Sequence, residues 1–496
     1  MATAHPQWSG DTDRPSSGRF PLAVEGYAMR RVESLLPGIT TVTPHARYYS
    51  LHAYVATLDA AASFDPTDIL RRCEVVFAAV SILHARNSPD AHRGMSQPHG
   101  QDKIVDSMNA DVLPISQLAA PRAYAQARRG FLAPYFASER SLGLIFPDND
   151  RLLPGENSDP KLLKHAFAGL LDLALQDDVP LTELESHPHL CLCGEQAAER
   201  AWLRSIMLSS DASGEKNDAD RRSQTALMLC RLIEMYEPPD ISNWLSRVLI
   251  ADPTTSEDPR LSTLPIVPAW RGVVLRRWYT WAWRDLWRWL VNTKATGVVP
   301  ISQLQGALAD ELPSCTVAEF RRSLPPGIVG GSLLDAEYDP SVASIEHSGA
   351  RNFAWLVIGA SRSGRLDEQV GAYFESPERE RRNYELTPAW FENFLDLRND
   401  RPLKDVSIEL IGLLLARSQR IAYAKSALVN GRWKVPTRLT VRDGYAFRDA
   451  DEGGGPVSLR WDQLTQVMSG LGLVKRVRDG QTSAERWNLV KSGVNE

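Results

Sequence analysis

The chain has 496 residues, a length that at about 100–200 residues per domain predicts two to four folded units. Its 43% hydrophobic and 24% charged residues are typical of a globular protein and exclude disordered, collagen-like and disulfide-scaffold proteins. The longest apolar runs are far shorter than the roughly 20 residues that cross a bilayer, and five cysteines are too few for a disulfide framework. We therefore expect a cytoplasmic, mainly α, multidomain protein with reduced thiols and no membrane partner.

Charge is unevenly distributed along the chain. The net charge is -5, yet residues 417–496 hold fourteen Lys and Arg against eight Asp and Glu, which gives +6. The preceding residues therefore carry 42 basic and 53 acidic side chains, or -11. A basic end on an acidic body favours a surface that neutralises phosphates. The alternative is that these basic residues only solvate the exterior of a small domain.

The first half of the chain reads as a flexible leader, a helical domain and a linker. Residues 1–19 lack apolar periodicity and predict the leader, and residues 20–208 predict the helical N-terminal domain. Helices are expected over 42–62, with Thr43 as N-cap and Pro44 at the first helical position, and over 121–135, 159–176 and 195–208. Residues 209–223 are charged and have no apolar anchor, so they predict a linker.

Residues 224–400 predict a helical central domain rich in tryptophan. Six of the fourteen tryptophans lie between residues 270 and 289, on several faces of one predicted helix. A helix that is apolar nearly all round is usually buried between partners. Because Trp and Arg are favoured at binding hot spots, we expect a protein-partner interface at Arg277, Trp281, Trp283 and Trp287. The alternatives are a place in the core and a stacking platform for single-stranded nucleic acid.

Residues 401–496 predict a winged-helix-like basic α+β module. A long helix over 403–428 precedes a hairpin around Asp443-Gly444, and a helix over 459–470 precedes a second hairpin around Asp479-Gly480. A helix followed by a basic hairpin is the pattern of a recognition helix and its wing. The residues expected to contact nucleic acid, duplex DNA in particular, are Lys475, Arg476, Arg478 and Arg460.

Two short motifs, at residues 359–366 and 187–193, contain residue types that bind phosphates or metal ions. Residues 359–366 have the glycine spacing of a phosphate-binding loop but lack its lysine and its magnesium-binding hydroxyl, so they fail as a nucleotide site. His187, His189, Cys191 and Cys193 alternate, and in an extended segment they would share one side. Neighbours on that side are nearly 7 Å apart, so at most two could share a zinc ion, and a buried cysteine pair is expected instead.

A second polar cluster could bind a nuclease-type metal ion. Its members are His84, His92, His99, Asp102 and Asp106. Their spacing matches no metal motif, and Cys193 has no recognisable His or Asn/Asp partner for nucleophilic catalysis. We therefore expect no metal ion, no cofactor and no catalytic residue.

One stretch resembles known sequences. Residues 35–55 contain Pro37-Gly38, Thr40-Thr41 and Ala46-Arg47-Tyr48-Tyr49, which predict a turn whose Arg and Tyr tie it to the following helix. This stretch resembles uncharacterised bacterial families found in antiviral-defence islands, often beside helicases or nucleases. The resemblance implies a context and no reaction.

The leading hypothesis from the sequence is a non-enzymatic, nucleic-acid-associated subunit of a bacterial antiviral-defence or DNA-processing assembly, with protein partners such as a helicase or nuclease. One alternative is a metal-dependent nuclease that uses the cluster between His84 and Asp106. The other is a scaffold whose winged helix docks a partner protein.

Overall fold

The computed structural model of the chain is mainly helical, with short antiparallel strand pairs, as the sequence predicts. It describes residues 19–58, 65–108, 111–148, 151–208, 216–375, 385–429, 431–478 and 484–490. The chain divides into two compact units. Unit 1 comprises the chain up to Arg31 together with Pro268–Val457, and unit 2 comprises Val32–Val267 together with Ser458–Glu496.

Unit 2 is built mainly from helices. They are α2 (Ala46–Thr57), α3 (Pro66–Asn87), α4 (Gln101–Ser107), α5 (Ile115–Leu118), α6 (Leu132–Ser141), α7 (Pro160–Ala166), α8 (Leu170–Ala174), α9 (Leu181–Glu185), α10 (Arg200–Leu208), α11 (Lys216–Tyr236), α12 (Ser242–Ala251), α13 (Pro253–Glu257), α14 (Pro259–Ser262) and α23 (Trp461–Gly470), with the 3-10 turns η2 (Pro89–His92) and η3 (Pro188–Leu190). Its strand pairs are β1 (Val112–Pro114) with β4 (Asp178–Pro180), β2 (Ile145–Asp148) with β3 (Arg151–Pro154), and β12 (Val474–Arg478) with β13 (Glu485–Leu489).

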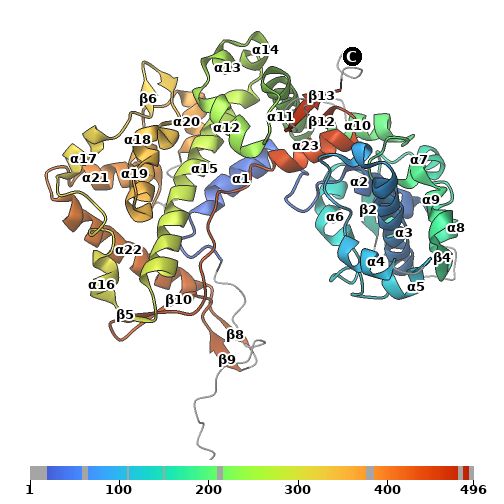
Figure 1. Ribbon diagram of the computed structural model, residues 1–496, viewed down its shortest axis with the longest axis horizontal. Helices are drawn as coiled ribbons and strands as arrows, with labels where there is room; N and C mark the ends of the chain where they lie inside the picture. The colour runs from blue at the N-terminus through green and yellow to red at the C-terminus, as the bar shows by residue number, and fades with distance from the viewer. Residues whose placement is uncertain are drawn as a thin grey trace, which may run out of the picture. The chain divides into compact units, whose positions relative to one another are not determined.

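Helix α3 is the central element of unit 2. Pro66 occupies its first turn and the Asp65 carboxylate accepts the Thr67 N–H at 3.0 Å, which caps the helix. The run from Val75 to Val80 is buried throughout, because α4, α8 and α9 pack around the helix (Figure 1). The last turn of α3 carries His84 and ends at a proline-started 3-10 turn, η2. The fold thus fixes one end of a helix next to a short loop that holds His92.

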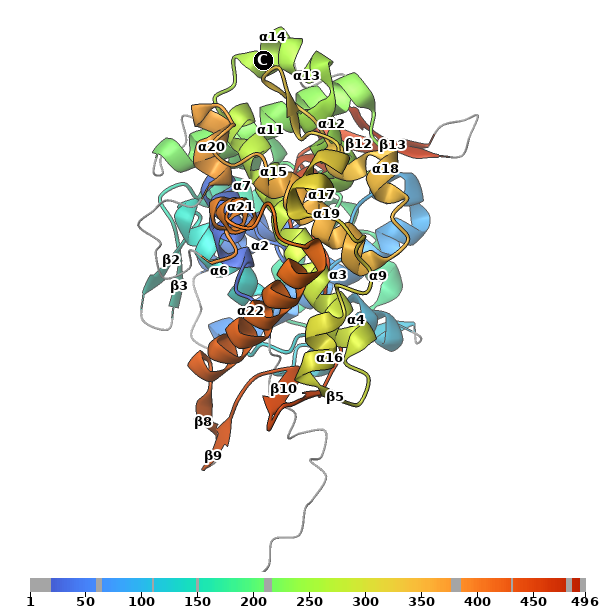
Figure 2. The same cartoon turned by 90° about the vertical axis from the view of Figure 1, so that its left-hand side faces the viewer.

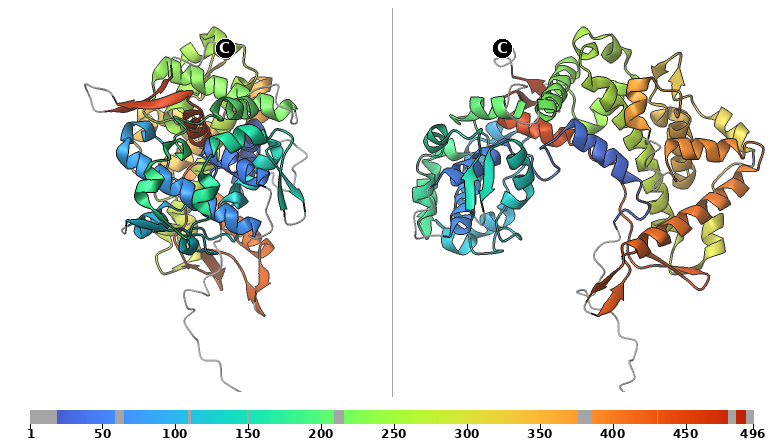
Figure 3. Two further views of the ribbon diagram at one scale, coloured as in Figure 1. Left: turned by 90° about the vertical axis from the view of Figure 1, so that its right-hand side faces the viewer. Right: turned by 180° about the vertical axis from the view of Figure 1, so that it is seen from behind.

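Helix α23 and the β12–β13 hairpin also belong to unit 2 (Figure 3). The helix packs against α2 and α11, and Asp462 is its one exposed residue. A recognition helix needs a free face with side chains that reach bases. The burial of α23 therefore corrects the prediction that this helix enters a DNA groove.

Unit 1 contains helices and four strand pairings. Its helices are α16 (Ile301–Gly306), α17 (Val317–Ser323), α18 (Pro340–Ala343), α19 (Ser348–Ala360), α20 (Glu368–Phe374), α21 (Pro388–Asp396) and α22 (Leu403–Ala424), with the short turns η4 (Leu290–Lys294) and η5 (Ala336–Tyr338). Helices α1 (Glu25–Leu35) and α15 (Ile266–Trp289) contribute residues to both units. The strands are β5 (Val298–Pro300), β6 (Ile328–Val329), β7 (Ser332–Leu333), β8 (Ala427–Val429), β9 (Arg432–Lys434), β10 (Leu439–Arg442) and β11 (Tyr445–Arg448).

The tryptophan-rich helix α15 forms the core of unit 1. Trp283 is fully buried and meets the Phe391 ring edge-on, and Trp287 is 2% exposed. Arg277 is buried too and donates to the Val457 carbonyl at 2.8 Å. Trp281 is half-buried and donates to Asp285. The predicted partner interface is therefore wrong at Arg277, Trp283 and Trp287, whose side chains are buried inside the chain, and stays a prediction at half-buried Trp281.

The region predicted as one winged-helix-like module is divided. Asp443 and Gly444 have φ of 52° and 83° and close the β10–β11 hairpin, which confirms that turn. The hairpin then pairs with β5, from a segment far earlier in the chain, to form the three-stranded sheet β10-β11-β5. Helix α22 runs directly to the β8–β9 pair (Figure 2). All of these elements belong to unit 1, whereas α23 and its hairpin belong to unit 2, so residues 401–496 do not form one contiguous domain.

Other boundaries also differ from the predictions. The predicted linker over 209–223 lies partly outside the described residues, and its second part begins α11, where Arg222 is buried and donates to the Met207 carbonyl. Helix α2 is N-capped by His45, because Thr43 instead accepts the Thr40 N–H and closes the preceding turn. Residues 121–131 form turns in place of the expected helix. Within the described part of the chain, no helix combines the length and the apolar character that spanning a bilayer requires.

Candidate metal centre

Four potential metal ligands converge in unit 2. They are His84, His92, Cys191 and Cys193. His84 comes from the last turn of α3 and His92 from η2, eight residues later. The two cysteines follow η3, about a hundred residues farther along the chain. Among the described residues this is the one group of His, Cys, Asp and Glu side chains with the geometry of a metal site.

The ligand atoms are spaced as a single ion requires. All four lie within 4.8 Å of one another. His84 Nδ1 is 3.0 Å from His92 Nε2, Cys191 Sγ is 3.2 Å from His92 Nε2, and Cys193 Sγ is 3.7 Å from His84 Nδ1. Zinc bonds of about 2.0–2.3 Å in a tetrahedron place neighbouring ligand atoms about 3.3–3.8 Å apart. Two thiol sulfurs and two imidazole nitrogens thus lie close enough together to share one ion.

The two thiols differ in their environments. Cys191 and Cys193 are 1% and 6% exposed, and the two histidines are half-buried. Burial raises the pKa of Cys191. Its thiol donates to Cys193, and this hydrogen bond, helped by His92, lowers the pKa of Cys193 to about 4. The lowered pKa of Cys193 favours its thiolate, which is the form of cysteine that binds metal ions.

The cysteine segment is held in place by Arg47 of helix α2. Its Nη1 donates to the carbonyls of His189 and Cys191, at 2.8 and 2.5 Å, while its Nε pairs with Glu199 at 2.8 Å. Arg47 and Glu199 are both almost fully buried. The guanidinium thus fixes the backbone on which both thiols are mounted.

Two further contacts shape this segment. Ser81 of α3 accepts the Leu192 N–H at 2.8 Å, which anchors the residue between the cysteines to the helix that carries His84. Gly194 has φ of 64°, and a Cβ there would lie 3.1 Å from the Gly470 carbonyl oxygen and 3.2 Å from Arg47. The turn after Cys193 therefore requires glycine.

The loop after His92 is held by the C-terminal elements of unit 2. Gln466 of α23 donates to the Gly94 carbonyl and accepts the Ser96 N–H. Arg93 pairs with Glu485 of β13, and the Arg476 side chain covers Gly94. These contacts explain why η2 stays folded back toward α3 and the cysteines.

The alternating quartet of the sequence analysis is only half right. Residues 188–190 form a 3-10 turn instead of an extended strand, so His187 and His189 leave the side on which the cysteines lie. His189 contacts the Ala168 carbonyl at 3.0 Å, and the His187 ring packs against Gly169. Of these four, Cys191 and Cys193 belong to the group of potential ligands, and its other two members are His84 and His92.

The cluster considered for a nuclease is not assembled. Its histidines His84 and His92 join the cysteines, whereas His99 contacts the Tyr135 hydroxyl at 3.1 Å and stacks on Phe131. Asp102 and Asp106 are exposed on α4, and no described carboxylate belongs to the metal-ligand group.

A second buried polar network lies close by in unit 2. His52 Nδ1 is 2.6 Å from Glu139 and His52 Nε2 is 2.9 Å from Glu74, with all three side chains fully buried. Burial alone would lower the pKa of His52, but the two carboxylates outweigh it and raise that pKa to about 10. The His52 ring contacts both glutamates and so links α2, α3 and α6. Tyr49 donates to the Gly38 carbonyl at 2.8 Å and ties the preceding turn to α2, as the sequence predicts.

The predicted nucleic-acid contacts separate into engaged and exposed residues. Arg460 has φ of 59° and donates to the Ile39 carbonyl at 2.8 Å, and Arg476 pairs with Glu485. Lys475 and Arg478 are exposed. In the hairpin register Val477 faces Arg486, which places Arg486 on the same face as Lys475.

No protein-family model, curated protein or solved structure matches the chain. The assignment of the site therefore depends on its own geometry. From the sequence, the two cysteines and the two histidines belong to different clusters. The Cys-x-Cys pair indicates half of a metal site, which needs two more ligands from elsewhere in the chain. Nothing in the spacing shows that the end of α3 meets residues 191–193, because that contact depends on tertiary packing.

Proposed function

We propose that unit 2 binds one zinc ion through His84, His92, Cys191 and Cys193. The observation that carries this proposal is the convergence of the four ligand atoms within 4.8 Å. Two sulfurs and two imidazole nitrogens in a tetrahedron are a ligand set that zinc prefers. Zinc binding replaces our expectation that the protein holds no metal ion.

The role we assign to the ion is structural. Four protein ligands close the coordination sphere, whereas a catalytic zinc keeps one position for water or substrate. The ion would cross-link the end of α3, the segment after η3 and the η2 turn, which has no buried residue of its own. A closed Cys and His site also argues against the nuclease alternative, which needs an open, oxygen-rich site.

The test is metal analysis of purified full-length protein and of matched variants. We expect one zinc per chain in the wild type, and loss of it in Cys193→Ser and His92→Ala. His189→Ala and Cys230→Ser are the controls and should retain zinc, because neither side chain is among the four ligands. A zinc-free wild type that also fails to take up added Zn²⁺ contradicts the proposal.

Cobalt substitution provides a second readout. Co²⁺ bound by two thiolates in a tetrahedral site gives intense visible and thiolate charge-transfer bands, whereas Co²⁺ bound by surface histidines does not. The wild type and His189→Ala should show these bands, and Cys193→Ser should lose them. Wild-type protein that binds Co²⁺ without thiolate bands would contradict the ligand assignment.

The second function we propose is the nucleic-acid association expected from the sequence. It is supported by the exposed Lys475, Arg478 and Arg486 on the β12–β13 hairpin. These cations can contact phosphates, and with α23 buried the hairpin would bind without a recognition helix. Titration of the full chain with duplex DNA, single-stranded DNA and RNA at several salt concentrations tests it. The scaffold alternative predicts no binding to any of the three, and membership of a defence assembly with a helicase or nuclease stays a prediction.

A further inference from the structure

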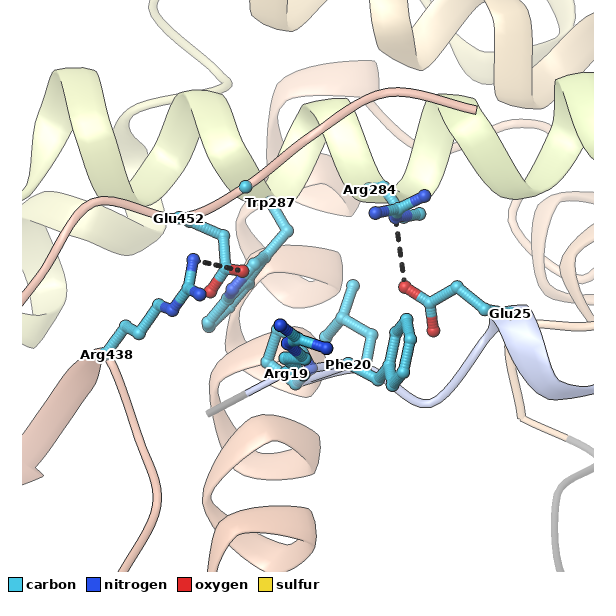
Figure 4. A pocket seen from close by; sticks show the side chains of 10 residues that line it. Arg19, Phe20, Glu25, Arg284, Trp287, Arg438 and Glu452 are labelled. Atoms are coloured by element: carbon cyan, nitrogen blue, oxygen red, sulfur yellow. Dashed lines mark hydrogen bonds and ion pairs between the residues drawn. The ribbon is translucent and has the colours of Figure 1, made fainter. Parts of the chain in front are cut away.

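Unit 1 contains a cavity of about 280 Å³ that the zinc proposal does not use. It is lined by the residues before and at the start of α1, by the last turns of α15, and by the segments that flank β10 and β11. Figure 4 shows Glu25 and Glu452 on opposite sides of the cavity, with Arg19, Phe20 and Trp287 between them. Its size is near the lower end of the range for small-molecule sites.

Three arginines line the cavity, Arg19, Arg284 and Arg438, and the structure gives contacts with neighbouring groups for the last two. Arg284 pairs with Glu25 Oε1 at 3.1 Å and donates to the carbonyls of Gly454 and Gly455. Arg438 donates to the Asp451 carbonyl at 2.7 Å and pairs with Glu452 at 3.4 Å. These contacts hold the two guanidinium groups at the wall.

The acidic groups are less well satisfied. Glu25 is 3% exposed, and its Oε2 is buried without a hydrogen-bond partner among the described residues. A buried carboxylate oxygen that lacks a partner is costly unless a ligand supplies one. Burial raises the pKa of both Glu25 and Glu452, and the charge on Glu25 raises that of Glu452 further. A positive charge between the two carboxylates would relieve both effects.

The aromatic walls fit the same kind of ligand. Trp287 is 2% exposed and lines the cavity together with Phe20. Indole is the aromatic ring that attracts cations most strongly, and the attraction grows where water is excluded. An apolar frame beside the charged group would cover the rest of these rings.

We propose that this cavity binds a compact organic cation, an ammonium or guanidinium group on a small apolar frame, between Glu25 and Glu452. The carboxylates hold the charge and Trp287 covers it. The two carboxylates would repel an anion placed between them. The cation would bind to unit 1 whether or not unit 2 holds zinc, since every lining residue belongs to unit 1.

Isothermal titration of the full-length protein tests this proposal, with agmatine as the cationic probe and succinate as the anionic one. We expect agmatine to bind once per chain with a Kd below about 1 mM, and succinate not to bind. Glu25→Gln and Glu452→Gln should each weaken agmatine binding about tenfold or more, because each removes a charged contact. Glu346→Gln changes an exposed glutamate of unit 1 and should leave the affinity unchanged.

Three results would overturn the proposal. The first is the absence of saturable agmatine binding, and the second is binding that neither glutamine variant weakens. The third is agmatine binding that appears only in Arg19→Ala, which would show that the Arg19 side chain is the cation held there. Circular dichroism of each variant checks its fold, and if Glu25→Gln unfolds, the Glu452→Gln titration decides.

Discussion

Replacement of Arg47 by methionine tests how the fold builds the metal site. Arg47 and Glu199 form a buried ion pair with 2% and 1% side-chain exposure, and Arg47 also donates to the carbonyls of His189 and Cys191. Removal of one partner from such a pair costs about 3–5 kcal/mol, because the other charge stays buried alone. Methionine has a similar length and fills most of the space of the arginine side chain. The loss of stability should therefore come from the lost polar contacts of Arg47 and not from a new cavity.

The same substitution also frees the cysteine backbone. Loss of groups that orient metal ligands typically lowers metal affinity by about 10–100-fold. That range equals about 1.4–2.8 kcal/mol, which is smaller than the cost of the broken pair. We therefore expect Arg47→Met to destabilise the protein even without zinc, and to weaken zinc binding in addition.

Urea unfolding with and without zinc, together with zinc competition against a chelator, separates the two effects. Arg140→Met is the control, because Arg140 is exposed in the same unit and its loss should change stability by no more than about 0.5 kcal/mol. Equal unfolding free energies of zinc-free wild type and zinc-free Arg47→Met would refute the reasoning about the buried pair. An unchanged zinc affinity would refute the role of Arg47 in positioning the thiols.

Three further predictions concern other features. The unfolded-state pKa of His52 is about 6.5, and its folded pKa is raised to about 10. Its stabilising contribution is therefore complete below pH 6.5 and is lost as pH rises toward 10. The difference in unfolding free energy between wild type and His52→Gln should shrink over that window, and a constant difference would contradict the charged state of His52. Arg362 lies in the segment that resembles a phosphate-binding loop, is fully buried and donates to both carboxylate oxygens of Glu337. Glu337→Gln should therefore lower the free energy of unfolding in urea by about 3–5 kcal/mol, and a decrease below about 1 kcal/mol would contradict this. If the β12–β13 hairpin binds nucleic acid, the double variant Lys475→Ala, Arg486→Ala should show a shallower dependence of log binding constant on log salt concentration, by about one unit per lost phosphate contact. Its unfolding free energy should stay nearly unchanged. An unaltered slope would mean that the hairpin does not contact the nucleic acid.

The sequence predicted those elements whose signals are local. Asp443-Gly444 marks a turn that needs positive φ at both residues, so the hairpin can be found without any tertiary information. The burial of the tryptophan-rich helix α15 follows from its apolar faces. Its assignment to a partner interface is wrong because periodicity shows that a helix face is covered, but does not show whether the same chain or a partner protein covers it.

The metal centre depends on contacts that the sequence does not encode locally. Cys191 and Cys193 were recognisable as a pair, but the turn at 188–190 decides that the neighbouring histidines point elsewhere. His84 and His92 were placed in another cluster, with His99 and two aspartates, because they are close in sequence. Only the packing of η3 against α3 brings the four ligands together.

The most direct test of the zinc centre is X-ray absorption at the zinc edge on purified full-length protein. The structure predicts a four-coordinate ion with two sulfur ligands at about 2.3 Å and two imidazole nitrogens at about 2.0–2.1 Å. In Cys193→Ser the sulfur contribution should fall or the zinc should be absent, and in His189→Ala the spectrum should match the wild type. A zinc shell without sulfur, or a wild-type protein that contains no zinc after exposure to it, would contradict the assignment of His84, His92, Cys191 and Cys193.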